Sequence, residues 1–270
     1  MTTKTFPLDG PINLLGRIGH GSFTVNAQDG LSEATVTLLA RSKDSDTLDN
    51  TVVEMRGNTL VIHTPRQRGI LDLGILGGRG RQREAIDITV SVPSGSAVKV
   101  SAHTADITLN GRTGSADIAS GSSTISLGEV DGDLRLRYGS GTAQVGSVCG
   151  SVEARSGSGD ASFGPIGGAL SAGCGSGNLE VTSVRGAVRS RAGSGTASLG
   201  AVYGDVDVAR GSGSITIGLP AGQPARLDVT TGSGRVESDV PIEDAPTTQH
   251  SAITVRARTG SGNVRVFRAA

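Results

Sequence analysis

The carboxylates are the side chains of this sequence that could do acid–base or metal chemistry, and their spacing supports neither. A calcium-binding β-repeat needs an aspartate at the same place in every turn. The equivalent place in successive repeats is instead mixed: Asp106, Thr124, Thr142, Asp160, Asn178, Thr196 and Ser214. A catalytic pair needs two carboxyl groups that lie close together in matched environments. The outward carboxylates fall in different repeats or at different positions: Asp133, Glu153, Asp160, Glu180, Asp205 and Asp207. We therefore expect a protein that is not an enzyme.

Histidines and cysteines are too few and too scattered to indicate a metal site. The two cysteines, Cys149 and Cys174, have no nearby histidine. The four histidines show no ligand spacing: His20, His63, His103 and His250. The glycines form neither a dinucleotide fingerprint nor a phosphate-binding loop, because no strand–turn–helix pattern or Gly-Lys-Ser/Thr follows them. The sequence predicts no metal and no cofactor.

Arginine is the residue type whose placement indicates binding. Five arginines occupy outward positions on repeated strands, where stacking would align them into a basic stripe: Arg135, Arg137, Arg155, Arg189 and Arg191. Such a stripe could contact phosphates or acidic glycans, because a guanidinium binds oxyanions through two hydrogen bonds. Glu153 and Asp207 interleave with it. This favours the alternative of a self-neutralised surface.

A second candidate is the segment RQRGILDLGILGGRGRQRE at residues 66–84, which interrupts the strand pattern. It combines aliphatic and basic side chains: Ile70, Leu71, Leu73, Ile75, Leu76, Arg79 and Arg81. One interpretation is an end cap whose leucines cover the core. The other is an exposed docking loop for a partner protein or for self-association.

Composition excludes several classes of partner. The chain has 25 basic and 25 acidic residues, so its formal net charge is zero. This argues against duplex DNA or an anionic membrane surface. Aromatic residues make up only 2% of the chain, too few to stack the bases of single-stranded nucleic acid. No export signal and no apolar run long enough for a membrane helix is visible. We expect a cytoplasmic protein that inserts in no membrane.

These side chains must be positioned by a repeat of 18 residues. Gly-Ser-Gly recurs at that interval, starting at Gly139, Gly157, Gly175, Gly193 and Gly211. Each repeat contains two short segments in which apolar residues alternate with polar or small ones, which is typical of half-buried strands. One repeat cannot bury its own apolar face, so neighbouring repeats must stack. The prediction is an all-β, single-chain parallel β-solenoid with about 18 residues per rung, right-handed because parallel crossovers are.

The regularity of the repeat predicts the domain organisation. Residues 1–84 form irregular strands and a cap, and residues 85–270 form the regular solenoid with insertions at 220–231 and 240–252. We expect Val152, Leu170 and Val188 in one internal file, and ITVRARTGSGNVRVF (253–267) as the last rung.

The order of these segments resembles a known family. The run IDITVSVPSGSAVKVSAHTADITLNG, the repeated Gly-Ser-Gly turns and LPAGQPARLDVTTGSGRVESD are similar to the bacterial β-strand-repeat family of unknown function called putative adhesins. The resemblance covers about Gly21 to Phe267. It implies a β-helix, a role in adhesion or the cell-envelope stress response, and no catalytic residues.

Two functional hypotheses follow. The first is a non-enzymatic scaffold or interaction protein that presents flat strand faces to another protein or to its own copies. The alternative is a glycan-binding or stress-response protein of the cell envelope or, less favoured, a carbohydrate-active enzyme.

Overall fold

A computed structural model describes residues 1–41, 48, 50–65, 85–240 and 252–269. These residues form 20 β-strands in two compact units, residues 1–128 and 129–270. The all-β prediction is confirmed, and most strand pairs are parallel. The candidate docking residues from Ile70 to Arg81 lie outside the described residues. The predicted division at residue 84 concerns the regularity of the repeat and stays a prediction.

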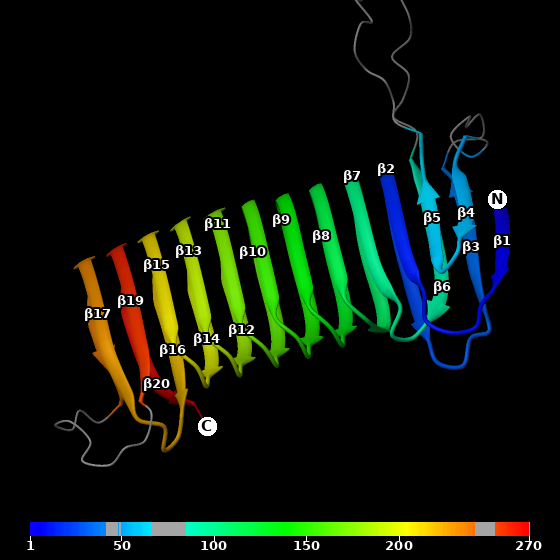
Figure 1. Ribbon diagram of the computed structural model, residues 1–270. Coiled ribbons are helices and arrows are strands. Elements are labelled where there is room, and N and C mark those ends of the chain that lie inside the picture. Colours follow the sequence, from blue (N-terminus) through cyan, green and yellow to red (C-terminus); the bar gives the residue numbers. More distant parts are fainter. Residues whose placement is uncertain (42–47, 49, 66–84, 241–251, 270) are drawn as a thin grey trace, which may run out of the picture. The chain divides into compact units, whose positions relative to one another are not determined.

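The first unit contains eight strands, and their order in the sheet differs from their order in the chain. They are β1 (Thr2–Pro7), β2 (Asn13–Gln28), β3 (Glu33–Ala40), β4 (Val52–Arg56), β5 (Thr59–His63), β6 (Ile86–Pro93), β7 (Ala97–Thr113) and β8 (Ala116–Val130). The long strand β2 lies in parallel between β7 on one side and β5 and β6 on the other (Figure 1). Strands β1, β3 and β4 extend this sheet in antiparallel pairs.

The second unit is a stack of parallel strands. It contains β9 (Leu134–Val148), β10 (Val152–Ile166), β11 (Leu170–Ser176), β12 (Leu179–Val184), β13 (Val188–Ser194), β14 (Ala197–Val202), β15 (Val206–Ser212), β16 (Ile215–Pro220), β17 (Ala225–Ser233), β18 (Val236–Ser238), β19 (Ile253–Ser261) and β20 (Val264–Ala269). Figure 1 shows β9, β10, β11, β13 and β15 side by side in chain order. The second strand segment of each rung pairs in the same way: the C-terminal half of β10 pairs with β12, β12 with β14, and β14 with β16.

An apolar file runs through this stack. Val152 pairs with Leu170, which pairs with Val188, so residues 18 apart in the sequence are neighbours in the sheet. All three side chains are at most 2% exposed. The expected internal file is therefore present. It forms because the side chains of a strand alternate between two faces, and the repeat places an aliphatic residue at the same inward position each time.

The final segment of the chain is not at the end of the sheet. Val255 of β19 pairs with Val206 of β15 on one side and with Leu227 of β17 on the other. Figure 1 shows β19 between β15 and β17. The segment is a rung, as expected, but the prediction that it is the terminal one is wrong. Its alternating pattern is equivalent to that of β17, so either segment can pair with β15, and sequence order does not decide between them.

Candidate functional site

Two columns of outward-facing residues cross the strands β9, β10, β11, β13, β15, β19 and β17 of the second unit. Because the alternate residues are buried in the core, the residues between them point to solvent. In sheet order the first column is Arg135, Glu153, Ser171, Arg189, Asp207, Arg256 and Asp228. The second column is Arg137, Arg155, Gly173, Arg191, Ala209, Arg258 and Thr230. We call these two columns the arginine face.

Each carboxylate of the arginine face contacts two arginines. Glu153 Oε2 accepts a hydrogen bond from Arg135 Nε at 3.0 Å and forms an ion pair with Arg135 Nη2 at 2.9 Å, and Glu153 Oε1 is 3.1 Å from Arg155 Nη2. The other two repeat this arrangement: Asp207 with Arg189 and Arg191 at 3.7 and 3.6 Å, and Asp228 with Arg256 and Arg258 at 3.7 and 3.2 Å. The arginine side chains in these pairs are 55–72% exposed. Exposed pairs of this kind contribute about 0–1 kcal/mol each, so the guanidinium groups can exchange partners at little cost.

The arginine face is charged although the chain is neutral. Its two columns carry seven arginines and three carboxylates, an excess of four positive charges. The chain as a whole has a formal net charge of zero. The charge of the molecule is therefore distributed unevenly, with a positive surface on these strands.

All five arginines of the predicted stripe lie on this face, and the structure adds Arg256 and Arg258. The sequence reasoning missed these two because their distance from Arg189 and Arg191 is not a multiple of 18. The Arg-x-Arg pattern was a usable signal, since it appears in LRLRY, VRSRA and VRART. The interleaved carboxylates expected from the sequence are present, but they neutralise only part of the face.

Several carboxylates considered for catalysis or calcium have a structural role at the corners. Asp160 Oδ1 accepts a 2.7 Å hydrogen bond from the backbone N–H of Asn178, and Asn178 Oδ1 accepts one of 3.0 Å from Thr196. At the other corner, Asp133 and Asp205 accept from the amides of Ser151 and Thr254. These side chains satisfy amide groups of the adjoining rung. Among the described residues no group of three or more histidine, cysteine, aspartate or glutamate residues could hold a metal ion.

Comparison with known proteins decides the family. The sequence pattern of the family described as Toastrack DUF4097 matches residues 18–269. The chain belongs to the Toastrack DUF4097 family. No curated protein matches this Toastrack chain.

Solved structures similar to this Toastrack chain come from several bacteria. A putative adhesin from Bacteroides fragilis is 14% identical, with 98% of this chain and 96% of that chain covered and a TM-score of 0.41. A putative adhesin from Parabacteroides merdae is also 14% identical, with coverage of 98% and 95% and a TM-score of 0.36. A putative cell adhesion protein from Clostridium sporogenes is 10% identical, with 99% of both chains covered and a TM-score of 0.26.

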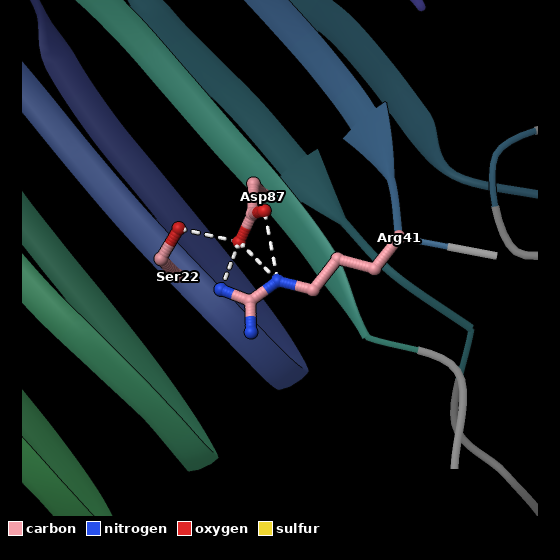
Figure 2. Close-up of polar contacts among 3 residues, drawn as sticks. All are labelled: Ser22, Arg41 and Asp87. Carbon is pink, nitrogen blue, oxygen red and sulfur yellow. Dashed lines mark hydrogen bonds and ion pairs between the residues drawn. The ribbon is translucent and has the colours of Figure 1, made fainter. Parts of the chain in front are cut away.

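In the first unit of this Toastrack chain, the carboxylate of Asp87 accepts hydrogen bonds from two side chains. Figure 2 shows Asp87 between Arg41 and Ser22. Arg41 donates from Nε at 2.9 Å and from Nη2 at 2.7 Å to the two carboxylate oxygens, and Ser22 Oγ donates at 2.6 Å. The hydrogen bond from Arg41 holds the pKa of Asp87 below its ordinary value, against the opposing effect of partial burial. The cluster joins β2, the end of β3 and β6.

Two histidines that are distant in the sequence lie together in this unit. The rings of His20 and His103 pack edge to face with their centroids 5.5 Å apart. They meet because β2 lies beside β7. The sequence showed no relation between them, since pairing of these strands is not encoded in the repeat interval.

The structure describes no helix that is both long and apolar enough to cross a membrane.

Proposed function

We propose that this Toastrack protein is a non-enzymatic, adhesin-like interaction protein whose arginine face binds an acidic surface of another protein. The observation that carries the proposal is the excess of four positive charges on the arginine face of a chain with no net charge. Charge complementarity sets the specificity and the association rate of such contacts. Arginine suits this role because its planar group binds carboxylates through two parallel hydrogen bonds.

The interleaved carboxylates favour a protein over an acidic glycan. Glu153, Asp207 and Asp228 are spaced along the whole face. A uniformly charged polyanion would approach all three and be repelled by them. A protein surface has charges of both signs at discrete positions, so it can place carboxylates against the arginines and a cation or a neutral group against each acid.

The size of the arginine face predicts a weak, salt-sensitive contact. Six strand spacings of about 4.8 Å and five residues along each strand give an area of roughly 29 by 17 Å, or about 500 Å². A stable complex buries about 800 Å² on each partner. We therefore expect transient binding that weakens as salt screens the exposed charges.

The test compares capture by two charge-matched variants. Wild-type protein on a solid support is mixed with lysate of the source organism, and bound proteins are identified by mass spectrometry. We expect acidic proteins that elute below about 0.5 M NaCl, where the screening length falls to a few ångströms. The double variant Arg189→Ser/Arg191→Ser loses them. The control Arg235→Ser/Arg265→Ser removes the same charge from exposed positions off this face and keeps them.

Two outcomes would contradict the proposal. One is capture that survives the loss of Arg189 and Arg191. The other is specific binding to an array of acidic glycans with no captured protein, which would support the alternative of a glycan-binding envelope protein.

Self-association is the second candidate, supported by the last strands of the described sheet. Val236 of β18 is 49% exposed, and Leu227 and Val229 of β17 are only partly buried. A strand edge with uncovered apolar side chains can pair with a second copy. Sedimentation velocity tests this: concentration-dependent growth that Val236→Lys abolishes would support it, and a monomer at all concentrations would exclude it.

We further infer that the strands coil as a right-handed solenoid with about 18 residues per rung. The support is the pairing of residues 18 apart from β9 to β16 and the handedness that parallel crossovers adopt. A crystal structure would test both features.

A further inference from the structure

A buried guanidinium occupies the interior of the second unit. Arg210 occupies the last inward position of β15 and is 5% exposed. Its neighbours in the same inward column are Ala192 and then Cys174. Ala192 is small, which leaves room for the long side chain of Arg210 to reach past it toward Cys174. Arg210 and Cys174 line the same cavity.

Among the described residues, no carboxylate pairs with the positive charge of Arg210. Its Nη2 donates to Ser190 Oγ at 3.0 Å and its Nη1 to the backbone oxygen of Ala209 at 3.1 Å. Its Nε is buried and has no hydrogen-bond partner among the described residues. Burial lowers the pKa of Arg210, as expected for a charge removed from water. A buried charge with no counter-charge is destabilising, so this site calls for a negative group.

Cys174, which lines the same cavity, makes hydrogen bonds of its own. Its Sγ–H donates to the backbone oxygen of Ser176 at 2.9 Å, and its sulfur accepts from Ser156 Oγ at 2.9 Å. None of the residues lining the cavity is an aspartate or a glutamate.

The cavity has the size and the access for a small ion. Its volume, taken as the space open to the centre of a water molecule, is about 20 Å³. One water molecule needs about 10–15 Å³ by the same measure. Exposed Asn178 and partly buried Cys174 lie in its wall, so it can be entered from solvent. Two donors lie on residues that line the cavity: the Nε–H of Arg210, which has no partner among the described residues, and the hydroxyl hydrogen of Ser190, whose oxygen already accepts from Arg210.

We propose that this cavity binds a small monovalent anion of the chloride class, with Arg210 supplying the charge and Ser190 the second donor. A water molecule could satisfy the Nε–H, but it would leave the charge uncompensated. A monatomic anion does both and fits the volume. The anion is then an internal structural component of the rung stack.

The first test measures thermal unfolding in sodium chloride against sodium gluconate at equal ionic strength, because gluconate is too large for the cavity. We expect chloride to raise the midpoint of the wild-type protein by roughly 3–6 °C when its concentration is about ten times the dissociation constant. Arg210→Met loses this rise, because the charge is gone. Arg235→Met, which removes an exposed arginine that does not line the cavity, keeps it.

A second measurement does not depend on the stability of a variant. Crystals of the wild-type protein grown in sodium bromide are expected to show an anomalous peak between Arg210 Nε and Ser190 Oγ. The proposal is overturned by equal midpoints in chloride and gluconate, by an undiminished chloride effect in Arg210→Met, or by bromide crystals without a peak in the cavity.

Discussion

Asp160 Oδ1 accepts a hydrogen bond of 2.7 Å from the backbone N–H of Asn178, the residue at the same position of the next rung. Asn178 repeats the contact with Thr196, so the corner side chains form a ladder along the stack. The ladder supplies an acceptor to amide groups at the corners of the rungs. Asp160 and Asn178 at this place thus have a structural role that involves no ligand.

Removing one side chain of this ladder should cost little but measurably. We expect Asp160→Ala to lower the free energy of unfolding by about 0.5–1 kcal/mol, because water can replace the lost acceptor at an exposed corner. Asp160→Asn keeps an oxygen in place and should lie within about 0.5 kcal/mol of the wild type. Urea denaturation measures both, and equal losses in the two variants would contradict the acceptor role.

The aliphatic file should be far more sensitive. Leu170 is 1% exposed and pairs with Val152 and Val188. Leu170→Ala leaves a cavity in the file and should cost about 2–5 kcal/mol. The neighbouring exposed residue gives the control, since Ser171→Ala should change stability by less than about 0.5 kcal/mol. A Leu170→Ala protein as stable as the control would show that this position is not packed.

Two glycines of the same strand and its corner should respond in opposite ways to alanine. Gly177 has a φ of +146°, and a Cβ added there would lie 2.2 Å from the backbone oxygen of Gly159 in the adjoining rung. Gly177→Ala should therefore destabilise the fold by more than about 1 kcal/mol. A Cβ at Gly173 would meet nothing within 4 Å, so Gly173→Ala should be neutral or slightly stabilising. Differential scanning calorimetry distinguishes the two, and similar midpoints would refute the close approach of the rungs.

The Arg41–Asp87 contact predicts a pH dependence of the first unit. Because the folded pKa of Asp87 is lowered from 3.8, its contribution to stability is present above that value and is lost as the pH falls through the folded pKa. Asp87→Asn should thus be less stable than the wild type at pH 7, and the difference should shrink as the pH drops below 3.8. Urea unfolding at pH 7, 4 and 3 measures this difference. A constant difference at all three pH values would contradict the assignment.

The arginine face predicts a gain of binding as well as a loss. Glu153→Gln/Asp207→Asn removes two of its three carboxylates and raises its excess charge from four to six. If the partner is an acidic protein, capture should persist to higher salt than with the wild type. Stability should change by less than about 2 kcal/mol, since the four ion pairs are exposed. Elution at unchanged salt would argue that the partner does not contact this face.

Sequence alone identified the alternation of apolar residues and the columns that it creates. Val152, Leu170 and Val188 lie in one file because the strand pleat turns a repeated inward position into a repeated inward side chain. The five arginines of the predicted stripe share a face for the same reason. The aliphatic file and the arginine stripe could both be predicted because each depends only on the face of its own strand that a residue occupies.

Only the tertiary structure decided which rungs are neighbours. Rungs with the same alternating pattern are interchangeable as parallel partners, so the chain can place β2 beside β7 and β19 between β15 and β17 without changing any inward position. That choice brought His20 to His103 and added Arg256 and Arg258 to the arginine face. The buried position of Arg210 was likewise a matter of packing, because it depends on the small Ala192 beneath it and the cavity beyond, which no residue of its own strand specifies.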